Sequence, residues 1–321
     1  MDHRQALVEL RQFLASRIFG QERLIDRLLM ALLADGHLLV EGAPGLAKTR
    51  AIKELAEGVE AGFHRIQFTP DLLPADITGT EIYRPETGSF VFQQGPVFHN
   101  LLLADEINRA PAKVQSALLE AMAERQVSVG CSTYRLPPLF LVLATQNSLE
   151  QEGTYPLPEA QLDRFLLHVR ISYPEAAVER RILQQARSEV AGNSTSPGPG
   201  YRVSQQAIFS ARQELLGLHM ADAVEEYLVQ LVMATRTPAK FDAELARWIA
   251  CGASPRGTIA LDRCARANAW LAGRDFVSPE DIQAVLFDAL RHRLILSFEA
   301  EAADISRDQV LQRILDVVAV A

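Results

Sequence analysis

The stretch Gly42-Ala43-Pro44-Gly45-Leu46-Ala47-Lys48-Thr49 decides the fold, because it lies between an apolar run at 37–41 and a segment of helical period. Glycines in such a loop let backbone N–H groups point at phosphate oxygens, and the start of the next helix adds a positive dipole. We expect Lys48 to reach the terminal phosphates and Thr49 to ligate Mg²⁺. Ala47 departs from the strict pattern, which has glycine before the lysine. The loop predicts binding of a nucleoside triphosphate, ATP above all, with magnesium; a plain Gly/Pro turn stays open as the alternative.

Two carboxylates, Asp105 and Glu106, follow the apolar run 101–104. Doubly wound sheets bind their ligands at the C-terminal ends of strands, so both carboxylates are expected near the phosphate loop. We predict that Asp105 holds the magnesium ion through water, and that Glu106 orients and deprotonates the water that attacks the terminal phosphate. Asn147 follows the run 139–145, where its carboxamide is expected to help position the same water. The alternatives are a solvated turn for the acidic pair and a turn former for Asn147.

Short apolar runs alternate with segments of helical period through the first part of the chain, after two expected helices between 7 and 34. The runs lie at 37–41, 66–68, 101–104, 139–145 and 165–171. This alternation predicts an α/β fold of the P-loop NTPase type, with a parallel sheet flanked by helices on both faces. Two segments, 81–92 and 127–136, are predicted as hairpins that project from the sheet. We expect Phe90 and Phe92 in the first hairpin to pack a local core.

A polar, Pro/Gly-rich break divides the chain at Asn193-Ser194-Thr195-Ser196-Pro197-Gly198-Pro199-Gly200. Such a composition is typical of linkers and surface loops. We predict a nucleotide-binding domain at 1–190 and an all-α lid domain at 201–321, because helical period runs through nearly all of the second part. Two Ser-Pro pairs, Ser254-Pro255 and Ser278-Pro279, are expected to begin helices, each with serine as the cap and proline at the first helical position.

The composition of the 321 residues, 48% hydrophobic and 22% charged, is that of a folded globular protein longer than one typical domain. A net charge of −8 argues against broad nucleic-acid binding, which depends on basic residues that neutralise phosphates. Cys131, Cys251 and Cys264 form no Cys-x-x-Cys pair, so we predict neither a disulfide framework nor a zinc site. No apolar run approaches the roughly 20 residues that span a bilayer, and the first residues are unlike a signal sequence. We therefore expect a cytoplasmic location.

Longer motifs give the chain a resemblance to the MoxR family of AAA+ ATPases, in the helix-2-insert clade. The segment Leu103-Ala104-Asp105-Glu106-Ile107-Asn108-Arg109-Ala110-Pro111 carries most of this resemblance. Three further segments reinforce it: Gln115-Ser116-Ala117-Leu118-Leu119-Glu120-Ala121-Met122, Thr145-Gln146-Asn147, and Pro156-Leu157-Pro158-Glu159-Ala160-Gln161-Leu162-Asp163-Arg164-Phe165. Together the motifs cover most of the first predicted domain. Family members commonly carry alanine at the position of Ala47.

The resemblance implies a homo-oligomeric ring, a hexamer, with an ATP site at each subunit interface. In such a ring Asn147 is sensor 1, and Arg164 is the arginine finger that is offered to the neighbour's nucleotide. Arg256 then corresponds to sensor 2, with its action in its own or an adjacent site left open. Arg164 forming an ion pair with Asp163, and Arg256 lying solvated at the surface, are the alternatives.

The resemblance also implies functions for less chemical parts of the chain. Phe19 and Gly20, in Ile18-Phe19-Gly20-Gln21, correspond to the segment that lines the adenine pocket. The two hairpins correspond to inserts that face the pore or the top surface of the ring. Members of the family couple ATP turnover to remodelling, maturation or cofactor insertion of a client protein, often one that contains a von Willebrand factor A domain. We expect a client of this kind.

Three other functions stay open from the sequence. A DNA-dependent AAA+ motor shares the hairpin insertions, although the acidic balance of the chain weighs against it. A magnesium-chelatase-like ATPase subunit would drive metal insertion by a separate protein. A nucleotide-sensing scaffold would bind nucleotide with negligible turnover, but the intact pair Asp105 and Glu106 argues for hydrolysis.

Overall fold

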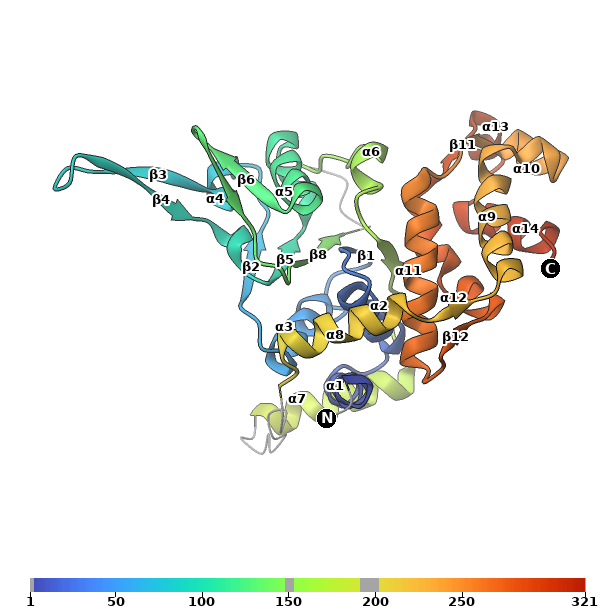
Figure 1. The fold of residues 1–321 in the computed structure, drawn as a ribbon, viewed down its shortest axis with the longest axis horizontal. Coiled ribbons are helices and arrows are strands. Elements are labelled where there is room, and N and C mark those ends of the chain that lie inside the picture. Colours follow the sequence, from blue (N-terminus) through green and yellow to red (C-terminus); the bar gives the residue numbers. More distant parts are fainter. Residues whose placement is uncertain (1–2, 148–152, 191–201, 321) are drawn as a thin grey trace. The chain divides into compact units, whose positions relative to one another are not determined.

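A five-stranded sheet lies at the centre of the first compact unit, in the strand order β2–β5–β8–β1–β9 (Figure 1). The computed structural model describes residues 3–147, 153–190 and 202–320. The neighbours β1 and β8, β5 and β8, and β2 and β5 run parallel. The strands are β1 Leu38–Glu41, β2 Phe63–Gln67, β5 Leu101–Asp105, β8 Leu141–Gln146 and β9 Leu167–Arg170. The predicted parallel α/β sheet is confirmed.

The central strands are apolar because helices cover the sheet from both sides. Residues 101–104 of β5 and 141–144 of β8 are fully buried, as parallel strands between two helical layers must be. Figure 1 shows α2 and α3 on one side of the sheet and α5 on the other. The edge strand β2 begins three residues before the predicted run, because its half-exposed first residues are partly polar and hide the pattern. The helices of this unit are α1 His3–Arg17, α2 Glu22–Leu33, α3 Lys48–Gly58, α5 Ala112–Glu124 and α7 Ala176–Val190.

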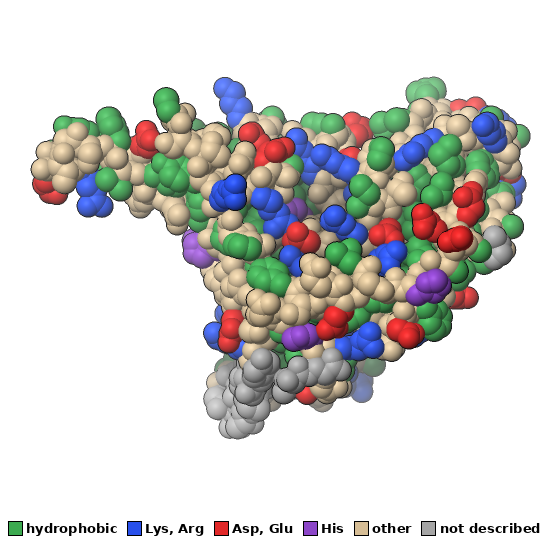
Figure 2. All heavy atoms as spheres, in the orientation of Figure 1, with side chains coloured by type: hydrophobic (Ala, Val, Ile, Leu, Met, Phe, Trp, Pro, Cys, Tyr) green, Lys and Arg blue, Asp and Glu red, His purple; other side chains and the backbone are tan. Residues whose placement is uncertain are grey.

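Two antiparallel hairpins extend from this unit, as predicted. They are formed by β3 Gly79–Arg84 with β4 Ser89–Gln94, after the short helix α4 Pro74–Thr78, and by β6 Gln126–Val129 with β7 Ser132–Arg135. Phe92 stacks on Tyr134 with ring centroids 4.0 Å apart, which joins the two hairpins. Phe90 is 68% exposed, so its predicted place in a local core is wrong: near the end of a two-stranded hairpin there is no second layer to cover it. Figure 2 shows hydrophobic side chains along this arm.

The second compact unit is mainly helical and comprises Pro158–His168 and Ser210–Ala321, while Met1–Leu157 and Val169–Phe209 form the first. Trp270 and Tyr227 are its largest buried side chains. The helical character of the C-terminal region is confirmed. Its helices, with α8 leading into the unit, are α6 Glu159–Leu162, α8 Gln205–Leu216, α9 Asp222–Arg236, α10 Ala243–Trp248, α11 Pro255–Leu271, α12 Pro279–Leu290, α13 Phe298–Ala302 and α14 Arg307–Val317.

Two pairs of very short strands interrupt these helices. β10 His219–Met220 pairs with β12 Phe276–Val277, and β11 Ile249–Cys251 pairs with β13 Ile295–Leu296. Strands of two or three residues are too short to show an alternating pattern in the sequence. The predicted boundaries 1–190 and 201–321 stay a prediction, and the predicted linker 193–200 lies outside the described residues.

Both Ser-Pro pairs begin helices as predicted. The hydroxyl of Ser254 accepts a hydrogen bond from the backbone N–H of Arg256 at the start of α11. Ser278 caps α12 in a capping box with Asp281, whose carboxylate accepts from the backbone N–H of Ser278. No helix among the described residues is long and apolar enough to span a membrane.

Candidate nucleotide site

The phosphate loop between β1 and α3 borders a cavity of about 380 Å³. The same cavity is lined by the acidic pair at the end of β5 and by the residues that end and follow β8. The structure therefore brings together the three motifs that the sequence predicted separately. The lining residues are Pro44, Gly45, Leu46, Ala47, Lys48, Thr49, Arg50, Asp105, Glu106, Thr145 and Asn147.

The backbone of the loop explains two features of its sequence. Ala47 has a φ of 59° in the left-handed region, where glycine carries no steric cost, so the glycine of the strict phosphate-loop pattern has a physical reason at this position. Gly42 lies close to Ile171, and a Cβ atom on Gly42 would be 2.5 Å from Ile171 Cγ1. Glycine is therefore required at position 42, where a side chain has no room, whereas alanine is tolerated at position 47, where the only cost is backbone strain.

Lys48 is buried at the base of the cavity and is held by backbone carbonyls. Its Nζ donates to the carbonyl oxygens of Gly42, at 2.6 Å, and Gln146, at 3.4 Å. Burial lowers the pKa of the ammonium group, while the carboxylates of Asp105 and Glu106 oppose this shift. A buried cation beside a polar cavity is well placed to bind a polyanion, whose oxygens are stronger acceptors than the carbonyls.

Asp105 is held by two neighbouring strands. The hydroxyl of Thr145 in β8 donates to Asp105 Oδ1 at 2.6 Å. From β2, the guanidinium of Arg65 donates to Asp105 Oδ2 from Nη2 at 2.7 Å and from Nε at 3.1 Å. These contacts fix the carboxylate in one orientation at the end of β5.

Glu106 has an unusual backbone and a constrained side chain. Its φ of 57° and ψ of 50° are left-handed, a conformation that is rare for residues other than glycine and that is enriched at functional sites. Its backbone N–H donates to Thr145 Oγ1 at 2.9 Å. Gln67 Nε2 and Arg109 Nη1 donate to Glu106 Oε2 at 2.7 and 3.1 Å. The left-handed turn aims this carboxylate at the cavity, and two donors hold it there.

Asn147 follows β8 directly and is buried against the same cavity. The oxygen donors that could hold a magnesium ion are the hydroxyl of Thr49 and the carboxylate of Asp105, which are hard ligands of the kind that Mg²⁺ prefers. No group of three or more His, Cys, Asp or Glu among the described residues could hold a metal ion by itself. This donor set fits Mg²⁺ that arrives with phosphate oxygens, since Mg²⁺ is usually bound by one or two protein ligands and the substrate.

Known proteins match the chain over most of its length. The family model of the ATPase family associated with various cellular activities (AAA) matches residues 37–167, and that of the AAA lid domain matches 244–314. Chaperone MoxR1 of Mycobacterium tuberculosis is 46% identical over 303 residues, 94% of this chain and 79% of the relative. Protein MoxR of Methylorubrum extorquens is 33% identical, over 96% of this chain and 94% of the relative. The chain belongs to the MoxR family of AAA ATPases.

A solved structure agrees with this assignment to the MoxR family. The crystal structure of an inferred ATPase from Cytophaga hutchinsonii has a TM-score of 0.90 and 45% sequence identity to this chain. The match covers 99% of this chain and 96% of that one. The MoxR-family chain is accordingly an ATPase with an AAA domain and an AAA lid.

A second cavity of this MoxR-family ATPase, of about 350 Å³, borders Gly20. Gly20 has a φ of 70°, and a Cβ atom there would be 2.6 Å from Val178 Cγ1 of α7, so only glycine fits. The ring of Phe19 lies under the guanidinium of Arg181, 4.2 Å from the ring centroid. The predicted role of Phe19 and Gly20 in binding adenine stays a prediction. Other lining residues are Gln21, Glu22, Arg23, Arg170, Ile171, Ser172, Tyr173, Pro174 and Glu175.

The two arginines that are predicted to act in catalysis belong to the second unit. Arg164 follows α6 and is half-buried, and Arg256 lies in the first turn of α11. Asp163 pairs with Arg293 at 2.8 Å and with Arg256 at 3.9 Å. The side chain of Arg256 is 54% exposed, and its Nη1 lies 3.9 Å from Asp163 Oδ2. Their predicted catalytic roles stay predictions.

Sequence reasoning assigned no role to four side chains of the nucleotide site: Arg65, Gln67, Arg109 and Thr145. Gln67 lies opposite Asp105 in the register of β2 and β5, and this register is a tertiary property. Thr145 lies in the segment Thr145-Gln146-Asn147, but the contact of its hydroxyl with Asp105 depends on β8 lying beside β5. Arg109 is only three residues from Glu106, whereas Arg65, Gln67 and Thr145 reach the acidic pair from neighbouring strands, which no local pattern in the sequence identifies.

Proposed function

We propose that this ATPase hydrolyses Mg-ATP in an oligomeric ring and couples turnover to the remodelling or maturation of a partner protein. The observation that carries the proposal is the placement of Lys48, Asp105 and Glu106 around one cavity next to the phosphate loop. With it we propose a nucleotide-binding domain at 1–190, a lid domain at 201–321 and a cytoplasmic location.

The residues of the nucleotide site that the sequence predicted have proposed tasks in hydrolysis. The loop N–H groups and Lys48 bind the phosphates, while Thr49 and Asp105, the latter through water, hold Mg²⁺, which when bound neutralises phosphate charge. Glu106 takes the proton of the attacking water, and Asn147 helps to orient that water. Gly20 and Phe19 contact the adenine.

The remaining charges of the reaction are assigned to arginines of the second unit. We assign Arg164 as a finger that stabilises charge on the terminal phosphate of a neighbour's nucleotide, a role worth roughly 10³- to 10⁵-fold in other phosphoryl-transfer enzymes. Arg256 is assigned as sensor 2. We also propose a ring with its ATP sites at subunit interfaces, as a finger offered to a neighbour requires, and six subunits, the number that the family resemblance implies.

The proposed partner is a client protein, with a von Willebrand factor A domain as the first class to test. The name of the relative Chaperone MoxR1 supports a client in general. The exposed side chains of Tyr83 and Phe90 on the β3–β4 hairpin support contact with another protein, since exposed aromatic residues cost free energy in water.

Replacing Glu106 by glutamine tests the assigned chemistry. Glutamine keeps the shape of the side chain but cannot accept the proton of water, so kcat should fall about 10³-fold while nucleotide affinity stays within about threefold. Glu120→Gln, at an exposed position of α5, is the matched control and should keep wild-type turnover. Wild-type hydrolysis in Glu106→Gln would refute the role of Glu106. Client proteins retained by this ATP-locked variant would identify the partner.

A further inference from the structure

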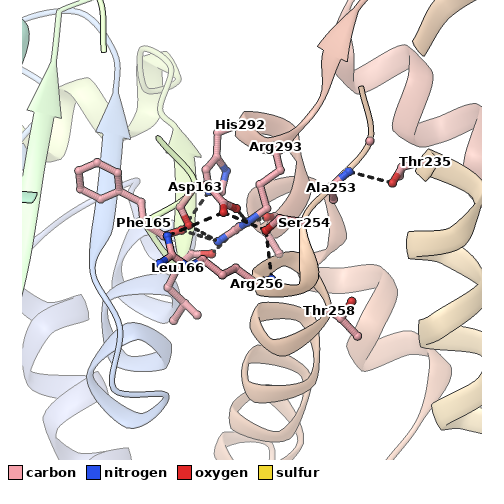
Figure 3. A network of polar contacts seen from close by, with 12 residues as sticks. Asp163, Phe165, Leu166, Thr235, Ala253, Ser254, Arg256, Thr258, His292 and Arg293 are labelled. Carbon is pink, nitrogen blue, oxygen red and sulfur yellow. Dashed lines mark hydrogen bonds and ion pairs between the residues drawn. The ribbon is translucent and has the colours of Figure 1, made fainter. Parts of the chain in front are cut away.

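Arg293 is buried inside the second unit and has an acceptor for each of its donors (Figure 3). Its Nε donates to Asp163 Oδ1 at 2.8 Å, and its Nη2 donates to the carbonyl oxygens of Phe165 and Asp163 at 2.6 and 3.3 Å. Its Nη1 donates to the carbonyl oxygens of Leu166, at 3.3 Å, and of Ala289. A guanidinium has five N–H groups, so the fork of Arg293 is saturated. Four of the five acceptors belong to the segment 163–166.

The two residues before Arg293 in η4 Arg291–Arg293 also bind the backbone that follows Arg164. His292 Nε2 lies 3.0 Å from the carbonyl oxygen of Phe165, and because a carbonyl only accepts, Nε2 carries the proton. Burial holds the pKa of His292 well below its ordinary value, so the ring is neutral. Arg291 Nη1 donates to the carbonyl oxygen of His168 at 2.9 Å. Three consecutive side chains thus bind the backbone on the C-terminal side of Arg164.

Asp163, on the N-terminal side of Arg164, also has both oxygens occupied. Oδ1 accepts from Arg293, and Oδ2 accepts from the hydroxyl of Ser254 at 2.8 Å. That hydroxyl caps α11 by accepting from the backbone N–H of Arg256. Figure 3 shows these side chains converging on Asp163 from α11 and from η4.

This arrangement is built for position more than for stability. Residues 163–166 form a turn and a bend between α6 and β9, so their carbonyl groups have no helix or strand partners of their own. Buried ion pairs contribute little net stability, because desolvation offsets the attraction, but they define geometry closely. The backbone on either side of Arg164 is therefore fixed by Arg293 and its neighbours.

We propose that Arg293 is a positioning residue: together with Asp163 it fixes the backbone on both sides of Arg164, so that the Arg164 guanidinium is delivered accurately to the phosphate. This inference rests on the proposed role of Arg164 as the arginine finger. In this role Arg293 does not contact the nucleotide and acts through Arg164.

The variant Arg293→Lys keeps the charge but offers three donors without the planar fork. A shift of roughly 1 Å at a catalytic group costs about 10²-fold in rate, so kcat should fall about 100-fold. Nucleotide affinity should stay within about threefold of wild type. Asp163→Asn, which preserves shape and removes the charge, should show the same direction of effect and serves if Arg293→Lys does not fold.

Subunit mixing separates positioning from a merely structural role. Full-length Glu106→Gln subunits keep their own Arg164 intact but do not hydrolyse ATP. Mixed with Arg293→Lys subunits, they should supply a correctly placed finger to neighbours that retain Glu106, and ATPase activity should rise several-fold above the sum of the two parents. A merely structural role of Arg293 predicts simple dilution, with no rise.

Two further variants distinguish failure of the finger role of Arg164 from failure of the positioning role of Arg293. Arg164→Ala must lose activity and be rescued by the same mixing; full activity of Arg164→Ala alone would refute the finger itself. Rescue of Arg164→Ala without rescue of Arg293→Lys or Asp163→Asn would overturn the positioning role while leaving the finger intact. Asp281→Asn removes a comparable buried partner of an arginine, Arg274, in the same unit, and should keep wild-type turnover per folded molecule.

Discussion

The nucleotide cavity of the first unit and the Asp163–Arg293 network of the second unit both contain buried charged side chains. These side chains differ in how many of their hydrogen-bonding groups are already occupied. Lys48 in the cavity donates to two carbonyl groups, one of them at 3.4 Å, and its pKa is lowered by burial. Arg293 in the network has five donors and five acceptors, and Asp163 uses both oxygens. The cavity also contains two left-handed residues that are not glycine, Ala47 and Glu106.

The contrast indicates how the two regions contribute to function. A charged group whose hydrogen-bonding positions are only partly occupied, next to a strained backbone, is available to a ligand. In the ligand-free protein such a group lowers the stability of the fold. A charged side chain whose donors or acceptors are all occupied cannot bind a ligand as well, and it instead holds its neighbours in place. Although an intact buried pair adds little net stability, removal of one partner leaves the other charge buried and uncompensated. We therefore expect substitutions of saturated charges to lower stability more than substitutions in the cavity do.

The largest stability effect is expected for Asp281→Asn in the second unit. Burial raises the pKa of Asp281, but hydrogen bonds from Arg274, Ser278 and Asn268 outweigh burial and hold the pKa below its ordinary value. Asp281→Asn removes the carboxylate that pairs with Arg274 and should lower the free energy of unfolding by about 3 kcal/mol. This value is at the lower end of the range for breaking a buried ion pair, because Arg274 is partly exposed. The midpoint of denaturant unfolding measures this, and an unchanged midpoint would contradict it.

The same pair has a pH dependence of fixed sign. Because the folded-state pKa of Asp281 is depressed, its contribution is present above the unfolded pKa and is lost as the pH falls through the folded pKa. Wild type should therefore lose more stability on acidification than Asp281→Asn does. Parallel acid titrations of the two proteins would show converging unfolding midpoints.

A smaller effect is expected for Thr145→Val in the nucleotide cavity. Valine has the shape of threonine but removes the bond to Asp105 Oδ1 and the acceptor for the backbone N–H of Glu106. Two lost hydrogen bonds should cost about 2 kcal/mol in stability. Hydrolysis should also slow, about tenfold, because both carboxylates lose their orientation. Thr133→Val, on the exposed β7 strand, should change neither quantity, and equal effects of the two would remove the special role of Thr145.

The smallest effect, with the opposite sign, is expected for Ala47→Gly in the phosphate loop. Glycine removes the steric cost of the left-handed conformation, a gain of up to about 1 kcal/mol. Ala56→Gly, inside α3, should instead lose about 1 kcal/mol of helix propensity. Thermal unfolding of both variants without nucleotide measures the difference. A lower melting temperature for Ala47→Gly would show that Ala47 is not strained.

The sequence predicted the parts of this molecule that depend on local patterns. The loop around Lys48, the acidic pair at the end of β5, the Ser254 cap and the projecting hairpins all have short-range signatures, and the structure has each of them where the pattern indicated. Phe90 was placed wrongly because alternation identifies a strand face but not whether another layer covers that face.

The parts that escaped prediction depend on contacts between distant segments. Gln67 reaches Glu106 because β2 lies beside β5, and Arg293 reaches Asp163 across 130 residues of sequence. The sequence around a single arginine such as Arg293 contains no pattern that shows whether its guanidinium is exposed or buried with all of its donors bound. Positions that hold a site in place were therefore found only from the folded structure.

The most direct test of the nucleotide site is equilibrium binding of a fluorescent ATP analogue in the presence of Mg²⁺. Wild type and Lys53→Met, an exposed lysine of the same helix, should bind with equal affinity. Lys48→Met should bind about 10²-fold more weakly, because it loses charge-assisted bonds to the phosphates. Equal affinity of Lys48→Met and wild type would contradict the assignment of this cavity as the nucleotide site.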